Sequence, residues 1–117
     1  MPAQSIYHIC KWVDWQAALA EGEYRGSADD LRDGFIHFST AGQVEASAAR
    51  HRAGQAGLVL LTVDPDALGQ ALRWEPSRDG ILFPHLYGTL PVDTVRAVEA
   101  LPLGPDGRHI FPQLDRG

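Results

Sequence analysis

Three histidines lie in apolar, strand-like segments where valine or isoleucine is more usual. His8 stands in IYHIC, His37 in DGFIHFST and His85 in ILFPHLYG. Imidazole titrates near neutral pH, so it can exchange a proton with a substrate or hold an anion. Burying three such groups in a small core is costly unless they share a polar cleft, and we therefore expect these side chains to converge. The alternative is that each is a packing residue whose ring bonds a nearby carbonyl.

His37 has the neighbours best suited to a ligand. Ser39 shares its face of the expected strand, and Thr40 begins a T-A-G-Q pattern typical of a helix start. The first turn of a helix offers free backbone N–H groups and the positive end of the helix dipole. The sequence therefore predicts a corner that accepts a phosphate, pyrophosphate or carboxylate. Ser39 and Thr40 could instead serve only as helix caps.

Glu75 stands at the end of another expected strand. A carboxylate there could act as a general base or stabilise a developing cation, or it could simply be solvated. Together with the three histidines it would suit zinc or iron if all four converged. No local signature such as H-E-x-x-H accompanies them, so we expect no metal. We expect His51 and His109 to be surface or packing residues.

The composition narrows the class of protein. The 117 residues are 44% apolar and 21% charged, which predicts one globular domain over residues 1–117. A net charge of −5 without any basic run argues against a nucleic-acid partner. No apolar run reaches the roughly 18 residues of a membrane span, the first residues do not resemble a signal peptide, and Cys10 is the only cysteine. We expect a cytoplasmic protein with a small-molecule or nucleotide ligand, and the sequence identifies no protein partner.

The apolar pattern predicts an α+β domain in which strands are in the majority. Strands are expected over 6–12, 34–39, 57–64, 72–75, 81–90 and 95–101. Helices are expected over 15–21 after a cap at Asp14, over 28–33, from Thr40 through residue 52, and from Pro65. Pro84 predicts that its strand lies at an edge or contains a bulge. The punctuation after residue 101 favours a hairpin.

Several of these segments also carry a family resemblance. IYHI, DGFIHFST, LVLLTVD, RWE and LFPHLYGTL occur in this order, with Trp12 after the first block and Gln43 after the second. In this the chain resembles the bacterial and plant family called domain of unknown function 952, over about residues 6–101. That family is similar in fold to the ADP-ribosyltransferases. The resemblance implies a small split-sheet domain with short helices around a cleft for NAD.

The resemblance also implies roles for individual residues. His8 would hold the adenosine-side ribose or a phosphate of NAD. The block against the nicotinamide side would comprise His37, Phe38, Ser39 and Thr40. Glu75 or His85 would take the third position, commonly a glutamate that stabilises the ribosyl oxocarbenium ion or activates the acceptor, and the sequence leaves both open. A histidine there would resemble the RNA 2′-phosphotransferase branch, although the acidic net charge argues against a tRNA substrate.

Two functional hypotheses follow, both at this cleft. The first is a transferase or hydrolase that acts on NAD or a related nucleotide, with NAD as its substrate. Such an enzyme would hold the pyrophosphate with fixed dipoles and place a carboxylate or neutral imidazole near the cationic ribose carbon. The alternative is a non-catalytic module that binds a small anionic or nucleotide metabolite. A structural domain with packing histidines is a third reading.

Overall fold

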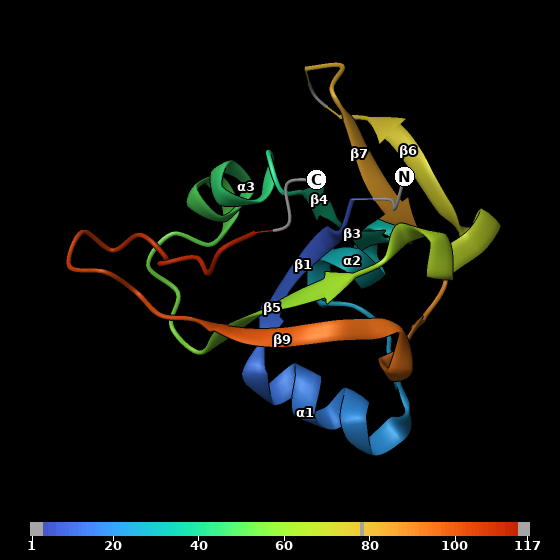
Figure 1. Ribbon diagram of the computed structural model, residues 1–117, viewed down its shortest axis with the longest axis horizontal. Coiled ribbons are helices and arrows are strands. Elements are labelled where there is room, and N and C mark those ends of the chain that lie inside the picture. The colour runs from blue at the N-terminus through green and yellow to red at the C-terminus, as the bar shows by residue number, and fades with distance from the viewer. Residues whose placement is uncertain (1–3, 78, 115–117) are drawn as a thin grey trace.

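The main sheet is built from the most apolar segments of the chain. The structure, a computed structural model, describes residues 4–77 and 79–114. The sheet is antiparallel, with the strand order β4-β1-β5-β9 (Figure 1). Its strands are β4 (Ser39–Thr40), β1 (Ile6–Lys11), β5 (Leu58–Val63) and β9 (Val95–Leu101). β5 lies between β1 and β9 and is apolar on both faces, as expected of a covered central strand.

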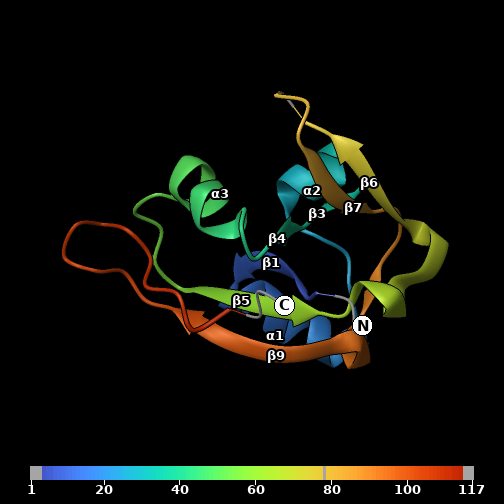
Figure 2. The same cartoon turned by 45° about the horizontal axis from the view of Figure 1, so that its top comes forward.

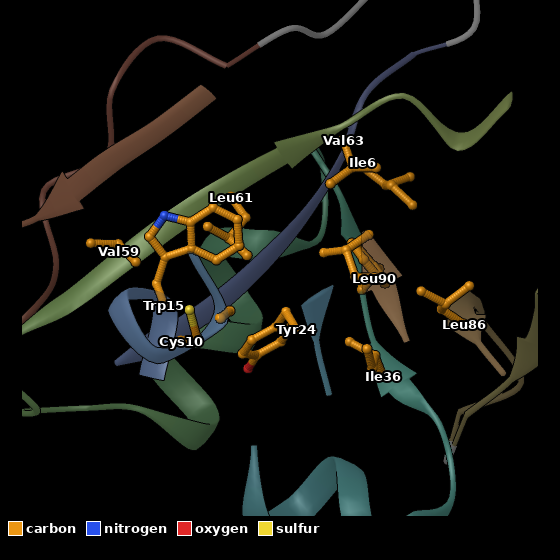
Figure 3. Packing of buried hydrophobic residues seen from close by; sticks show 12 residues of the cluster. Ile6, Cys10, Trp15, Tyr24, Ile36, Val59, Leu61, Val63, Leu86 and Leu90 are labelled. Atoms are coloured by element: carbon orange, nitrogen blue, oxygen red, sulfur yellow. The ribbon is translucent and has the colours of Figure 1, made fainter. Parts of the chain in front are cut away.

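Alternation along β1 divides the core into two clusters, because successive side chains of a strand point to opposite faces. Ile6 and Cys10 belong to a cluster that includes α1 (Trp12–Glu21), as Figure 3 shows. Tyr7 and Ile9 belong to a second cluster with α3 (Val44–His51). Because His8 alternates with Tyr7 and Ile9, it falls on the α1 face.

The first helix begins earlier than expected. Its N-terminal cap is Lys11, so Asp14 lies inside the first turn and is not the cap. The backbone N–H of Trp12 donates to the carbonyl of Gly57 at 2.8 Å, which ties the helix start to the chain entering β5. The end is as predicted: Gly22 has a φ of 89°, a conformation that glycine adopts without strain.

The expected strand over 34–39 is divided between two sheets. Its first part is β3 (Ile36–His37), which pairs with β7 (Leu82–Leu86) in a sheet of order β3-β7-β6, where β6 is Leu72–Pro76. Its second part is β4, which pairs with β1 in the main sheet. A backbone N–H donated by Phe38 to the carbonyl of Pro84 at 2.9 Å marks the crossing. This short segment therefore joins the two sheets.

The prediction that Pro84 lies in an edge strand or at a bulge is wrong, because β7 is the middle strand of its sheet and its register with β6 is continuous. The nitrogen and carbonyl of one strand residue point to the same side. The Pro84 carbonyl accepts from Phe38, so its nitrogen also faces the β3 side, just beyond the two-residue β3 ladder. The ladder with β6 therefore needs no N–H from proline, and the strand stays central.

The remaining elements follow local signals. Ser27 caps α2 (Ala28–Asp33), and Gly34 ends it. Asp64 caps a 3₁₀ segment, η1 (Pro65–Ala71), and an isolated bridge between Leu103 and His109 closes the expected hairpin after β9. A two-stranded ribbon pairs β2 (Glu23–Tyr24) with β8 (Leu90–Pro91), and a short η2 (Val92–Thr94) follows. The fold is mixed α+β with small antiparallel sheets and short helices, as predicted.

The described helices are short. Within residues 4–77 and 79–114, none is both long and apolar enough to cross a membrane.

Candidate functional site

The site lies at the open edge of the main sheet. β4 pairs only with Ile6 and Tyr7, so the edge of β1 is uncovered from His8 onward. Figure 2 shows α3 on one side of this edge and α2 with β7 on the other. A hollow of about 740 Å³ lies here, lined by residues of β1, α2, β3, β4, α3 and β7. All three histidines of the predicted cleft, His8, His37 and His85, are among the lining residues.

The Asp30 carboxylate is the polar centre of the site. Asp30 is only 3% exposed. Its oxygens accept from the backbone N–H of Ser27 at 2.7 Å, the backbone N–H of His37 at 3.1 Å and His37 Nδ1 at 2.6 Å. Burial by itself would raise the pKa of Asp30, but the hydrogen bond from His37 and the backbone donors outweigh burial and lower the pKa. Asp30 is therefore a buried anion with several donors.

A glycine allows Asp30 to sit this close to the preceding loop. Gly26 has a φ of 105°, and a Cβ placed on it would lie 2.6 Å from the Asp30 Cβ. Any larger residue would be strained in backbone conformation and would collide with the aspartate. Ser27 completes the arrangement, since its side chain accepts from the Asp30 N–H while Asp30 bonds the Ser27 N–H. This capping box fixes the start of α2 and the direction of the carboxylate together.

His8 lies deepest and has no free ring nitrogen. Its Nδ1 is 2.6 Å from the carbonyl of His37, so Nδ1 carries the proton and donates. Its Nε2 is 2.8 Å from the Tyr24 hydroxyl, and burial raises the pKa of Tyr24, which keeps the phenol protonated as a donor. Burial also lowers the pKa of His8 against the attraction of Asp30, 3.6 Å away. A neutral His8 therefore supports the site from within, through His37 and Tyr24.

His37 is held between two carboxylates. Its Nδ1 donates to Asp30, and its Nε2 lies 3.1 Å from Asp33 Oδ2 at the surface. The Asp30 hydrogen bond is the largest cause that raises the pKa of His37, with desolvation opposing it and Asp33 adding to the rise. The side chain is 40% exposed. A protonated His37 thus reaches the hollow. The partner of its Nε2 is the partly exposed Asp33, which a ligand can displace.

Titration of the imidazoles should separate these two histidines. A pKa of 6.5 is ordinary for histidine, and we expect His37 to titrate above it and His8 below it. Because the folded pKa of His37 is raised, its contribution to stability is complete below pH 6.5 and is lost as the pH rises through the folded pKa. NMR detection of the imidazole signals against pH measures both values. If Asp30→Asn leaves the His37 pKa unchanged, the assigned cause is wrong.

His85 is held by a second carboxylate. Its Nδ1 donates to Glu75 Oε1 at 2.9 Å, and the Tyr87 hydroxyl donates to the same oxygen at 2.7 Å. These two donors, Tyr87 first, lower the pKa of Glu75. In the neutral ring this geometry leaves the lone pair of His85 on Nε2. His85 lines the hollow, whereas Glu75 does not, so the structure places Glu75 behind the histidine.

An aromatic cluster brings His37 and His85 together. The rings of His37 and His85 lie 5.6 Å apart, edge to face, because these residues are directly paired between β3 and β7. Phe35 stacks on His85 with its centroid 4.1 Å away and also contacts His37 at 4.6 Å. The predicted convergence is therefore observed: His37 and His85 face the hollow side by side, and His8 lies beneath them.

At the predicted anion-binding corner, the helix begins later in the chain than expected. Residues 40–43 form a turn, in which Gln43 N donates to the Thr40 carbonyl, and α3 begins only at Val44. Gln43 Oε1 accepts from Thr40 N, so half of the expected capping box forms, but Gln43 Nε2 donates to the carbonyl of Leu82. The N-terminus of α3 therefore does not lie at Thr40, and the His37 ring contacts Asp30 and Asp33 of α2 instead.

The other residues of this block divide into two groups. Phe38 and Ser39 line the hollow; Phe38 is buried with its ring 5.6 Å from that of His8, and Ser39 Oγ donates to Ser47 Oγ. Thr40 pairs with Ile6 in the main sheet and is not among the lining residues.

Sequence reasoning missed Asp30, Asp33 and Tyr24. Asp30 belongs to the capping box of α2, but it also bonds His37. The S-A-D-D pattern at 27–30 gave a usable signal. A capping-box aspartate seven residues before a histidine, with only a glycine-ended turn of helix between them, must lie near that histidine. Tyr24 carried no comparable signal.

The remaining candidates lie outside this arrangement or are inert. In the described part of the chain, no group of three or more His, Cys, Asp and Glu side chains is arranged to hold a metal ion. Burial raises the pKa of Cys10 to about 12, so its thiol is a poor nucleophile. His51 is on the rim of the hollow, and His109 bonds the carbonyl of Gln55 away from it.

Comparison with known families gives a match over most of the chain. Residues 9–98 match the family described as protein of unknown function, DUF952. The chain belongs to this family. No curated protein gives a significant match to the DUF952 chain.

Solved structures confirm the fold of this DUF952 protein. The crystal structure of CC0527 from Caulobacter crescentus is 47% identical, covers 91% of this chain and 93% of its own, and has a TM-score of 0.88. A crystal structure of a double mutant of CC0527 has 46% identity, the same coverage of both chains and a TM-score of 0.87. The solution NMR structure of CC0527 is 48% identical, covers 89% and 90%, and has a TM-score of 0.81.

Proposed function

We propose that this DUF952 protein binds NAD or a related nucleotide in the hollow and cleaves it as a transferase or hydrolase. The observation that supports the proposal is the pair His37 and His85, each bonded to a carboxylate, side by side at a hollow of about 740 Å³. Pockets for small molecules and cofactors measure about 300–1,000 Å³. The resemblance to ADP-ribosyltransferases adds the expectation that the nucleotide is NAD.

The two histidines can take complementary roles in breaking the nicotinamide–ribose bond. Both electrons of that bond pass to the ring nitrogen, so nicotinamide leaves neutral and positive charge develops on the ribose carbon. In its neutral form, His85 can take the proton of the attacking water or acceptor hydroxyl through Nε2. A protonated His37 can donate a hydrogen bond to the ligand in place of Asp33.

Two observations support a choice between Glu75 and His85 for the third position in this proposal. Glu75 does not line the hollow, and its Oε1 already accepts from His85 and Tyr87. We therefore assign the position to His85, with Glu75 as the residue that orients its ring. His8 has both nitrogens engaged, and we assign it the positioning of His37 instead of contact with the ribose.

One observation favours the alternative, a non-catalytic binding module. ADP-ribosyltransferases commonly place a glutamate at the reacting carbon, and here the glutamate is engaged behind His85. A binding module would need the hollow and the charged His37 but no free carboxylate. The two functions give opposite results in one assay.

Release of nicotinamide from NAD tests the proposal. We expect the wild-type protein to release nicotinamide and form ADP-ribose, measured by chromatography of timed samples. His109→Ala is the matched control, since this histidine lies outside the hollow, and it should retain the wild-type rate. Binding of ADP-ribose without any release of nicotinamide would favour the binding module. Absence of both would contradict the proposed ligand.

A further inference from the structure

The hollow carries opposite charges on its two helical sides. The α2 side contributes the carboxylates of Asp29, Asp30 and Asp33, which outnumber its two cations, the guanidinium of Arg32 and the protonated ring of the adjacent His37. The α3 side contributes Arg50 and Arg52. Figure 2 shows these two helices on opposite sides of β1 and β4. A ligand that spans the hollow therefore meets carboxylates at one end and guanidinium groups at the other.

The arginines on the two sides are not equivalent. Arg32 is paired with Asp29 at 3.3 Å and with Asp33 at 3.0 Å, so its charge is neutralised. Within residues 4–77 and 79–114, neither Arg50 nor Arg52 forms an ion pair with a carboxylate. Arg52 is half-buried and donates a hydrogen bond to the neutral side chain of Gln55 at 3.4 Å. Burial is the main cause of the lowered pKa of His8, and the positive charge of Arg52 lowers it further.

The α3 side also presents neutral donors next to these cations. Gln43, Ser47 and Arg50 all line the hollow, and their spacing of four and then three residues puts them on one face of the helix. The Ser47 hydroxyl oxygen accepts a hydrogen bond from the Ser39 hydroxyl at 3.3 Å. Guanidinium groups with adjacent hydroxyl and amide groups are the side chains that best bind phosphate oxygens.

We propose, resting on the proposed function, that the hollow recognises an oxidised dinucleotide by its separated charges. The pyrophosphate lies on the α3 side against Arg50 and Arg52. The positively charged nicotinamide ring lies on the α2 side beside Asp33 and Asp29, next to His37 and His85. This orientation puts the bond to be broken at the two histidines and keeps each charged part of the ligand opposite its counter-charge.

A chemical consequence distinguishes this orientation from simple phosphate binding. The ring of NAD is a cation, whereas the ring of NADH is neutral, and both carry the same pyrophosphate. If Asp33 and Asp29 face the ring, the protein must bind NAD more tightly than NADH. If only the arginines contribute to binding, NAD and NADH must bind with the same affinity. ADP-ribose, which lacks the ring, reports on the α3 side alone.

Calorimetric titration with NAD, NADH and ADP-ribose tests the two ends separately. We expect Arg50→Gln combined with Arg52→Gln to weaken all three ligands about tenfold or more, since each lost charged hydrogen bond is worth about that much. We expect Asp33→Asn to weaken NAD several-fold, to remove the preference for NAD over NADH and to leave ADP-ribose unchanged. Arg96→Gln, on β9 away from the hollow, is the matched control and should change nothing.

The outcomes separate this inference from the function on which it rests. If the wild-type protein binds none of the three ligands, the proposed function fails and the orientation fails with it. If NAD and ADP-ribose bind but the paired arginine substitutions change neither affinity, only the orientation is wrong. Equal affinity of the wild-type protein for NAD and NADH would overturn the placement of the ring beside α2.

Discussion

Asp30→Ala is expected to lower the free energy of unfolding by about 3–5 kcal/mol, the usual cost of removing one partner from a buried ionic network. The substitution leaves the backbone N–H groups of Ser27 and His37 and the Nδ1 of His37 without the acceptor that each uses. Asp30 is 3% exposed, so water cannot readily replace the carboxylate. Urea denaturation of the wild type and the variant measures the difference.

The control for this substitution is on the same helix. Asp29→Ala removes a carboxylate whose side chain is 67% exposed and pairs with Arg32 at the surface, so we expect a loss of about 1 kcal/mol at most. Equal effects of Asp29→Ala and Asp30→Ala would show that the buried network does not stabilise the fold. Asp30→Asn should fall between them, because the amide can still accept one hydrogen bond.

The pKa of Asp30 gives the same interaction a pH signature. Its folded pKa is lower than the ordinary value of 3.8. The carboxylate therefore contributes its full stabilisation above the unfolded pKa, and this contribution is lost as the pH falls through the folded pKa. The stability of the wild type should decline below about pH 4, and that part of the decline should be absent from Asp30→Ala.

Substitution of His85 by alanine is expected to reduce nicotinamide release by roughly 10²–10⁴-fold, the range that a positioned acid or base contributes. In the proposed reaction His85 Nε2 takes the proton of the attacking group. His85 is 8% exposed, so far-UV circular dichroism must first show that the variant folds. Initial rates with saturating NAD then measure the effect.

Glu75→Gln distinguishes a catalytic role of His85 from a structural one. The amide keeps a neutral acceptor for His85 Nδ1 but removes the charge, so we expect a smaller loss of rate and a shifted dependence of the rate on pH. His109→Ala is again the control for loss of a histidine. If His85→Ala and His109→Ala have the same rate as the wild type, His85 does not take part in the reaction.

Much of the fold was predictable because its signals are local. Apolar runs identified β1 and β5, the hairpin punctuation after residue 101 favoured a strand for β9, and the glycines at 22 and 34 ended their helices as expected. The division of the strand over 34–39 was not predictable, because alternation continues unbroken through Ile36, His37 and Phe38 while their partners change. Which sheet a residue joins depends on the distant β7 and β1, and no local pattern reports that choice.

The histidines of the site were predicted from the sequence, whereas Asp30 and Asp33 were missed. Three histidines in apolar strands are unusual enough that the cost of burying them predicted a shared polar region, and they do share one. Asp30 looked like an ordinary helix cap because capping explains an aspartate after Ser27 fully. Its second role arises only when α2 folds against β3. The choice between Glu75 and His85 likewise depends on which side chain faces the hollow.

The most direct test of the account is a titration of the wild-type protein with ADP-ribose, followed through the ¹H–¹⁵N signals of its histidine rings. We expect the ring signals of His37 and His85 to shift together and to saturate at one ligand per chain, while the signals of His109 do not change. Saturable binding that leaves both His37 and His85 unperturbed would contradict it, because the nucleotide would then occupy a surface other than this hollow. Absence of any shift at all would contradict it too.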